Sequence, residues 1–347
     1  MDIRDLFQIS LPVIQAPMAG SQNHELAAAV CEAGGLGSIP AGMLDASLLD
    51  AELTAMAALT RKPYNLNFFC HRTPAADPVR NLAWLELLAP YLDTHGIEPA
   101  SIPDGANRRP FDAAMADVVE RHRPAVVSFH FGLPDDALLN RVRATGAKIM
   151  SSATTLEEGR WLQAKGVDAV VAQGLEAGGH RGLFLSDDLD GQLGTFTLLP
   201  QLVDALDVPV IAAGGIADAR GVAAAQALGA AGVQIGTTYL LCDESRASPL
   251  HRQALKSLGA ERTVLTTLFS GRPARGIVNR LIREVGPRPA AVTAFPLAGN
   301  AIARLRSQAE PAGLDDFSPL WAGQNASGCQ AIGAGRLTVE LAQGWSR

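Results

Sequence analysis

A single histidine in an open loop is the side chain best suited to chemistry in this sequence. The stretch Val170–Gly182, VVAQGLEAGGHRG, joins an apolar run to a loop with four glycines and carries His180 near its end. An unperturbed imidazole has a pKa of about 6.5, so it could take a proton from carbon or hydrogen-bond an anionic substrate. A loop histidine that only bonds a carbonyl is the alternative, and it stays open at this point.

Two glycine-rich segments further along are suited to phosphate. Gly214–Gly215 lies between an apolar run and a helical segment in PVIAAGGIAD, and Gly236–Thr237 follows the next apolar run in GVQIGT. Glycines let backbone N–H groups approach a phosphate closely, and a helix N-terminus adds positive potential. Simple tight turns would use the same residues, but their position after two successive strands favours a phosphate site.

The phosphate is expected to belong to flavin mononucleotide (FMN). Asn67 and Gln173 end two apolar runs, where their amides could pair with the pyrimidine edge of the flavin ring. The segment Ala16–Met18 would form an apolar wall against the ring. A strand-end cap and a satisfied polar group between strands are the alternatives for the two amides.

Weaker candidates for substrate contact accompany these residues. His130 and Ser128 would share one face of a strand, facing either the site or the core. Arg181 is expected to anchor its loop through a carboxylate such as Glu176, or else to bind a carboxylate-bearing substrate. His71 is a further, weaker candidate.

These residues need a scaffold of parallel strands. Short apolar runs bounded by Gly or Pro alternate with Ala-rich helical segments, and three times a helix, a glycine, a strand and another glycine follow one another. This pattern predicts an α/β fold, a closed (β/α)₈ TIM barrel, with an open doubly wound sheet as the alternative. The expected strands are Pro12–Ala16, Leu36–Pro40, Tyr64–Phe69, Ala125–Phe131, Lys148–Ser152, Ala169–Gln173, Pro209–Ala213 and Gly232–Leu240.

Two segments do not fit the repeat. Residues 71–123 are long for one crossover and predict a helical excursion within a barrel of residues 1–241. Residues 242–347 are expected to form a small, mainly helical lobe packed on the barrel, with a short hairpin. No linker of low complexity separates the two parts, so an independent module is not expected.

Composition excludes several classes of function. The 347 residues carry a net charge of −6 and 5% aromatic residues, which disfavours binding to nucleic acid or to an anionic membrane. No signal peptide or membrane span is recognisable, so we expect a cytoplasmic protein. We expect it to be a monomer or a homodimer. The four cysteines are far apart, and no metal site is expected.

Six ordered motifs together resemble the nitronate monooxygenase family, formerly called 2-nitropropane dioxygenases, and its class I in particular. They are PVIQAPMAG, NLNFF, VSFHFG, QGLEAGGHRG, PVIAAGGIAD and GVQIGT. The similarity spans Leu11 to Leu241 and extends loosely through the C-terminal segment. The resemblance implies an FMN barrel that oxidises alkyl nitronates with O₂, typically propionate 3-nitronate, to a carbonyl compound and nitrite or nitrate through a flavin semiquinone. It implies a detoxifying monooxygenase with His180 as the catalytic residue. It also implies FMN contacts at Met18, Asn67, Gln173, Gly178, Gly215, Gln234, Gly236 and Thr237.

Other functions remain open on the same barrel. An FMN-dependent NAD(P)H:quinone or enoyl-thioester reductase shares similar glycine motifs, and a non-catalytic flavin-binding protein is a further alternative. Chemistry of the IMP dehydrogenase type is excluded, because the loop Gly174–Gly182 has no cysteine. Where similar enzymes place tyrosine and lysine near the C-terminus, this chain has Phe295, Asn300 and Arg304, which leaves the substrate preference open.

Overall fold

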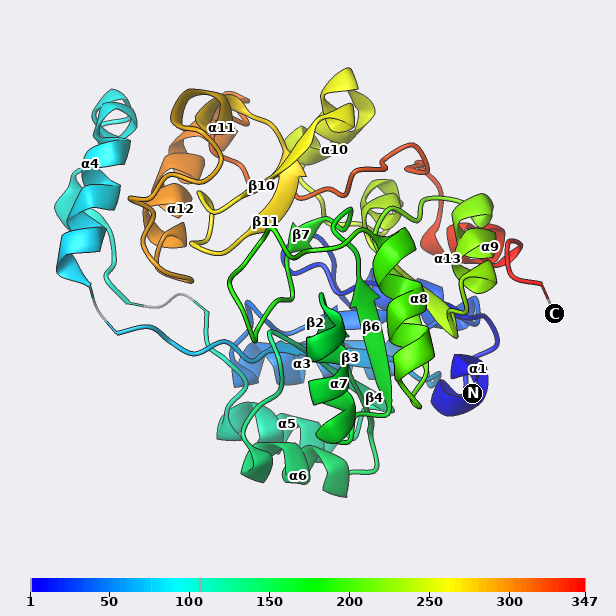
Figure 1. The fold of residues 1–347 in the computed structure, drawn as a ribbon. Coiled ribbons are helices and arrows are strands. Elements are labelled where there is room, and N and C mark those ends of the chain that lie inside the picture. The colour runs from blue at the N-terminus through cyan, green and yellow to red at the C-terminus, as the bar shows by residue number, and fades with distance from the viewer. Residues whose placement is uncertain (1, 76, 106–107, 347) are drawn as a thin grey trace.

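Eight parallel strands form a nearly closed barrel, which confirms the predicted fold. The computed structural model describes residues 2–75, 77–105 and 108–346, and the strands pair in the order β1-β9-β8-β6-β5-β4-β3-β2 (Figure 1). A parallel bridge between Ile14 and Leu36 joins the two ends of this order. The strands are β1 (Val13–Gln15), β2 (Ser38–Pro40), β3 (Asn65–Phe69), β4 (Val126–His130), β5 (Lys148–Ala153), β6 (Ala169–Gln173), β8 (Val210–Ala213) and β9 (Gly232–Ile235).

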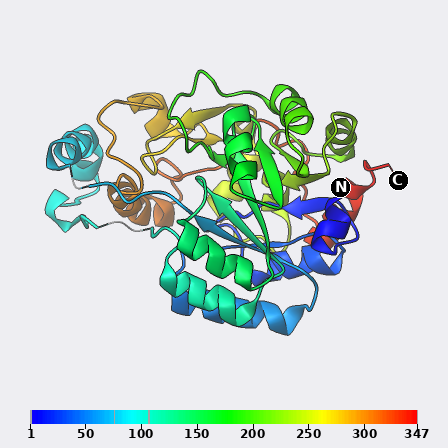
Figure 2. The same cartoon turned by 60° about the horizontal axis from the view of Figure 1, so that its bottom comes forward.

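Helices surround the strands (Figure 2). The outer helices are α2 (His24–Glu32), α3 (Ala46–Leu59), α5 (Ala113–His122), α6 (Asp136–Ala144), α7 (Leu156–Ala164), α8 (Thr195–Ala205), α9 (Ala219–Ala227) and α13 (Ala334–Ala342). In each of the three repeated units, a glycine in the left-handed conformation follows the helix, as predicted. These residues are Gly34, Gly166 and Gly229, with φ values of 98°, 74° and 90°. Glycine adopts this left-handed conformation readily, and it turns the chain from the helix into the next strand.

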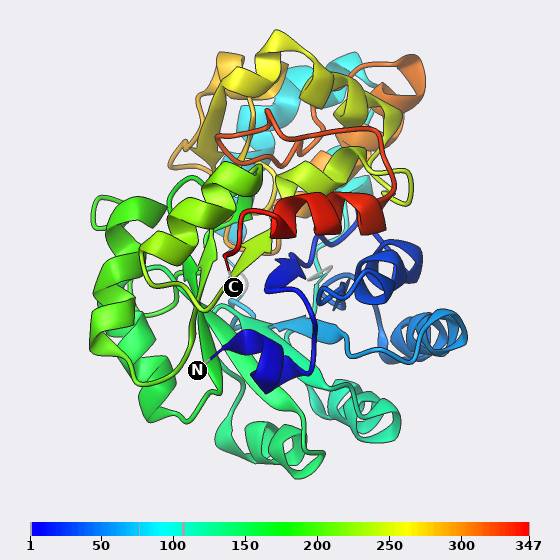
Figure 3. The same ribbon diagram turned by 90° about the vertical axis from the view of Figure 1, so that its right-hand side faces the viewer.

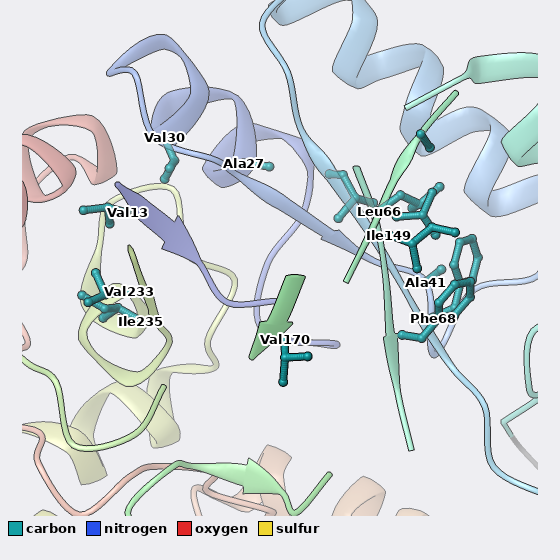
Figure 4. Close-up of a cluster of buried hydrophobic side chains, with 14 of the residues drawn as sticks. Val13, Ala27, Val30, Ala41, Leu66, Phe68, Ile149, Val170, Val233 and Ile235 are labelled. Atoms are coloured by element: carbon teal, nitrogen blue, oxygen red, sulfur yellow. The ribbon is translucent and has the colours of Figure 1, made fainter. Parts of the chain in front are cut away.

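The core has two layers, one on each side of the strands. Val13 and Val170 belong to a buried cluster that also contains helix residues such as Ala27 and Val30 (Figure 4). Their neighbours Ile14 and Val171 belong to a separate buried cluster that includes Ile3 of α1 (Ile3–Phe7). Strands buried on both faces explain why the sequence shows continuous apolar runs instead of alternation.

The last expected strand is much shorter than predicted. The run Gly232–Leu240 leaves the sheet after Ile235 and continues as the 3₁₀ helix η2 (Thr237–Leu241). The turn occurs at Gly236, whose ψ of −75° is far from the extended conformation. The apolar residues after it are buried without belonging to a strand, which is why the sequence pattern overextends the prediction.

A second group of elements packs at one end of the barrel (Figure 3). Helix α4 (Pro78–Thr94) contacts α12 (Gly299–Ala309), and both share a buried cluster with α11 (Arg280–Val285). Strands β10 (Thr263–Thr266) and β11 (Ala274–Ile277) form the expected hairpin, and β7 (Gly179–His180) pairs with β11. The remaining elements are α10 (Pro249–Lys256) and the 3₁₀ helices η1 (Pro99–Ser101), η3 (Leu258–Glu261) and η4 (Glu310–Ala312).

The end of the chain returns to the barrel. Helix α13 contacts α2, α9 and β1, and therefore completes the ring of outer helices. We propose that the lobe begins after residue 241, although α13 at its end packs on the barrel. In the part of the chain that the structure describes, no helix has both the length and the hydropathy to cross a membrane.

Candidate functional site

A deep cavity opens where the barrel strands end. The space not filled by protein atoms is about 1370 Å³, including the open mouth. All nine residues predicted to bind the cofactor line this cavity, together with His180, His130 and Ser128. The nine are Met18, Asn67, Gln173, Gly178, Gly214, Gly215, Gln234, Gly236 and Thr237.

The glycine-rich end of the cavity has the donors that a phosphate requires. Gly214 and Gly215 have φ values of 117° and 73°. Within the described part of the chain, we find no acceptor for the N–H groups of Gly215, Gly236 or Thr237. The Thr237 hydroxyl accepts a hydrogen bond from the Gly323 N–H at 2.9 Å, so its own proton remains available to an anion. This donor set fits the phosphate of a mononucleotide.

Gly178 brings the loop that carries His180 against the C-terminal segment. A Cβ at this position would lie 2.5 Å from the Gly323 nitrogen and 3.0 Å from the Ala322 Cα. The backbone contact therefore requires glycine at position 178.

The two predicted amides have different surroundings. Asn67 Nδ2 donates to the Ser128 hydroxyl at 2.9 Å, which leaves its Oδ1 for a ligand in the cavity. Gln173 donates to the His180 carbonyl at 2.9 Å and accepts from the Gly182 N–H at 2.7 Å. Gln173 therefore holds the histidine loop in place, and only its second amide proton remains for a cofactor.

His180 is fixed by a small sheet as well as by its loop. Residue 180 pairs with Ala274 of β11, and His180 Nε2 lies 2.8 Å from the Ser270 hydroxyl. The ring lies 5.6 Å from the Trp321 ring and 5.5 Å from the Phe295 ring. Burial, together with the positive charge of Arg108, holds the pKa of His180 well below its usual value of 6.5. His180 is therefore a neutral hydrogen-bonding group near neutral pH.

His130 holds the backbone of His180 through a hydrogen bond to its carbonyl oxygen. Its Nδ1 lies 3.0 Å from the Ser152 hydroxyl, and its Nε2 lies 3.1 Å from the His180 carbonyl oxygen. Burial lowers the pKa of His130 to about 4, so the ring is neutral and donates to that carbonyl. With both ring nitrogens engaged, His130 positions the loop.

Arg181 does not line the cavity. Its side chain is fully buried and donates to the Gly174 and Gln173 carbonyls at 2.6 and 2.8 Å, and to Gln192 Oε1. The anchor expected at Glu176 is not formed, because that carboxylate accepts hydrogen bonds from Thr195. Arg181 is therefore a loop anchor through backbone carbonyls, and the geometry gives it no substrate contact.

The remaining sequence candidates also take definite places. His71 is buried next to the Phe295 ring, at 4.8 Å, and burial lowers its pKa to about 4. Asn300 donates to the Pro103 and Gly105 carbonyls, and Arg304 donates to the Ser101 carbonyl. Phe295 is packed beside His180, whereas Asn300 and Arg304 hold a neighbouring loop.

Several site residues were not predicted. Arg108, Trp321, Gly323 and Asn325 all line the cavity, and Asn325 donates to the Gly215 carbonyl at 3.1 Å. Arg108 comes from the excursion between β3 and β4, whereas Trp321, Gly323 and Asn325 come from the C-terminal segment. The short motif WAGQN around Gly323 resembles the other glycine loops and was the available signal in the sequence. Among the described residues, no group of three or more His, Cys, Asp or Glu could hold a metal ion.

Comparisons with known proteins agree along the whole chain. Residues 2–344 match a family model described as nitronate monooxygenase. A nitronate monooxygenase from Paraburkholderia phytofirmans is 42% identical over 338 residues, covering 97% of this chain and 92% of the relative. One from Pseudomonas aeruginosa is 42% identical over 340 residues and covers 97% of each chain.

Solved structures are similar over the same length. A nitroalkane oxidase from Streptomyces ansochromogenes superposes with a TM-score of 0.88 at 39% identity, covering 99% of this chain and 98% of that one. FabK from Thermotoga maritima superposes with a TM-score of 0.73 at 26% identity, covering 99% and 94%.

Proposed function

The chain belongs to the nitronate monooxygenase family, and we propose that it is an FMN-dependent enzyme that oxidises alkyl nitronates, propionate 3-nitronate among them, with O₂. The products would be a carbonyl compound with nitrite or nitrate. One observation carries the proposal: the phosphate-binding glycines, the two amides and His180 all line one cavity at the strand ends.

The residues present fit FMN. Gly215, Gly236 and Thr237 would hold the phosphate through backbone N–H groups and one hydroxyl. Asn67 would meet the pyrimidine edge of the ring, and Met18 would lie against it within the cavity. FMN, when bound, would supply the electron acceptor that the side chains of this site lack.

His180 would orient the nitronate group. A nitronate is already an anion, so its oxidation requires no proton removal from carbon, and a neutral imidazole can donate a hydrogen bond to a nitro oxygen. Its Nε2 contacts Ser270, so Nδ1 is the ring nitrogen left for the substrate.

The Ser270 hydroxyl decides which role Nδ1 takes. If the hydroxyl donates to His180 Nε2, Nδ1 carries the proton and can hydrogen-bond a nitronate oxygen. If it donates instead to the Arg272 carbonyl at 3.3 Å, Nδ1 is a proton acceptor. Because the pKa of His180 is low, the accepting form is a weak base, and anionic nitronates are favoured over neutral nitroalkanes.

A comparison of the wild type with His180→Asn tests this role. Both proteins are loaded with FMN, brought to equal flavin absorbance, and assayed for oxygen uptake and nitrite with propionate 3-nitronate. We expect the variant to lose about 100-fold or more in kcat/KM, as when a group that stabilises developing charge is removed. Full activity of the variant on propionate 3-nitronate would refute the role of His180.

A further inference from the structure

Among the residues that the structure describes, one cation faces the cavity without a counter-ion. Arg108 is the single Lys or Arg side chain among the described residues that line the cavity. Its Nη1 is buried and has no hydrogen-bond partner within the described part of the chain. Its guanidinium carbon lies 5.8 Å from the centre of the Phe295 ring.

The surroundings of Arg108 do not offset its charge. Burial lowers the pKa of the Arg108 guanidinium, and the positive charge of Arg306 lowers it further. Burying an unpaired charge is costly unless a ligand completes its hydrogen bonds. After burial itself, the charge of Arg108 is the largest influence that lowers the pKa of His180, so the two groups act on the same part of the cavity.

The loop that carries Arg108 is anchored on both sides. Asn300 Nδ2 donates to the Pro103 and Gly105 carbonyls at 2.7 and 2.9 Å. On the other side, the Phe111 N–H donates to the Phe69 carbonyl at 2.8 Å. The guanidinium is therefore presented to the cavity from a segment that is attached to both the lobe and the barrel.

The other arginines near the site are already engaged. Arg181 is bound to backbone carbonyls, as described above. Arg272 donates to the Leu183 carbonyl, lies 4.2 Å from the centre of the Phe131 ring, and is under the influence of Asp187 and Glu158. Its Nε has no hydrogen-bond partner among the described residues, but Arg272 is not part of the cavity wall. Arg304 donates to the Ser101 carbonyl at 3.1 Å and is not part of the cavity wall.

We propose that Arg108 binds a carboxylate at the far end of the nitronate substrate and so selects nitronates that carry a second negative charge. This inference rests on the proposed function, because His180 and the cofactor take the nitronate end. A guanidinium binds a carboxylate through two parallel hydrogen bonds, and this arrangement would satisfy the free Nη1.

Two substrates of equal length test the selection. Propionate 3-nitronate and propyl 1-nitronate differ in the carboxylate that replaces a methyl group. The assay compares kcat/KM for both in the wild type, Arg108→Gln and Arg108→Lys. Arg109→Gln is the matched control, because Arg109 is exposed on the same loop and does not line the cavity.

For Arg108→Gln, the preference for propionate 3-nitronate over propyl 1-nitronate should fall about 10- to 100-fold, as expected for loss of a hydrogen-bonded charge pair. Arg108→Lys should lie between the wild type and Arg108→Gln, because a lysine keeps the charge and loses the two-pronged geometry. Arg109→Gln should leave the preference unchanged. The proposal would be overturned if Arg108→Gln lowered kcat/KM equally for both nitronates. It would also be overturned if Arg109→Gln reduced the preference as much as Arg108→Gln does.

Binding of unreactive analogues gives a second measurement that is independent of turnover. Succinate has the skeleton of propionate 3-nitronate, and butyrate has that of propyl 1-nitronate. Perturbation of the flavin absorbance should show tighter binding of succinate than of butyrate in the wild type, and loss of this difference in Arg108→Gln.

If the wild type oxidises neither nitronate, the proposed function fails, whereas an Arg108-dependent preference for succinate would still support the anion site. If succinate and butyrate bind equally to the wild type, the anion site itself is refuted.

Discussion

His180 Nε2 lies 2.8 Å from the hydroxyl of Ser270, a residue 90 positions further along the chain. The loop after β10 thereby controls the orientation of the ring that lines the cavity. Ser270 is almost completely buried and also lies 3.3 Å from the Arg272 carbonyl, so its hydroxyl can turn between two acceptors. Ser270 is therefore a positioning residue for His180.

Replacing Ser270 by alanine should lower kcat for nitronates about tenfold, because His180 loses the hydrogen bond that holds its ring. Steady-state oxygen uptake at several nitronate concentrations measures kcat and KM separately. We expect KM to change less than kcat, and Ser270→Thr to restore most of the rate because it keeps the hydroxyl. An unchanged kcat in Ser270→Ala, or no recovery in Ser270→Thr, would contradict this role.

Replacing Thr237 by valine should weaken FMN binding about fivefold to tenfold, because one hydrogen bond to the phosphate is lost. Fluorescence titration of the apoprotein with FMN measures the change. Riboflavin, which lacks the phosphate, should bind the variant and the wild type equally. Thr197→Val, on the exposed face of α8, is the control and should leave FMN affinity unchanged. Equal weakening of FMN and riboflavin would place the phosphate elsewhere.

Replacing Arg181 by methionine should destabilise the protein by about 2–4 kcal/mol, since two buried carbonyls lose their charged donor. Urea unfolding followed by far-UV circular dichroism measures the free energy of unfolding. Arg220→Met is the control, because the side chain of Arg220 is 90% exposed. If Arg181→Met kept full stability and instead raised KM for propionate 3-nitronate, Arg181 would be a substrate contact after all.

Stability should fall as the pH drops from about 6.5 towards 4. Burial lowers the pKa of His71, His130 and His251 to about 4 each, below the unfolded value of about 6.5. In this range the unfolded chain binds more protons than the folded one, so the stability that these groups contribute above pH 6.5 is lost on acidification.

Thermal unfolding between pH 4.5 and 7.5 measures this effect. His251 donates to the Trp321 carbonyl at 3.0 Å, and His251→Gln keeps a donor while removing one titrating group. The variant should lose less stability between pH 6.5 and 4.5 than the wild type does. A wild-type midpoint that does not change with pH over this range would contradict the prediction.

The barrel could be predicted because each strand has a local signature. Runs such as Ala169–Gln173 are apolar on both faces and end at glycine, and this reflects burial between the inner and outer layers of the core. The site residues at the strand ends followed from the rule that parallel strands present their ends to one cavity. The predicted strand Gly232–Leu240 extends too far, beyond Ile235, because the buried residues of the following 3₁₀ helix are also apolar.

The far wall of the cavity could not be predicted in the same way. Arg108 and Trp321 line the cavity and Ser270 contacts His180, although none of the three lies in a segment with a repeated pattern. They come together only because the lobe and the segment around Arg108 pack over the barrel mouth. The partner of Arg181 was also missed, because a sequence suggests a carboxylate more readily than it suggests backbone carbonyls. Such contacts depend on tertiary packing, and no local pattern in the sequence indicates them.

Oxygen uptake by the purified protein carrying FMN, with propionate 3-nitronate and no nicotinamide, tests the central claim most directly. A second run replaces the nitronate with NADH or NADPH and a quinone. We expect rapid uptake with the nitronate alone, accompanied by nitrite or nitrate. No uptake with the nitronate, together with rapid oxidation of NADH or NADPH, would contradict it and would assign this barrel to a reductase.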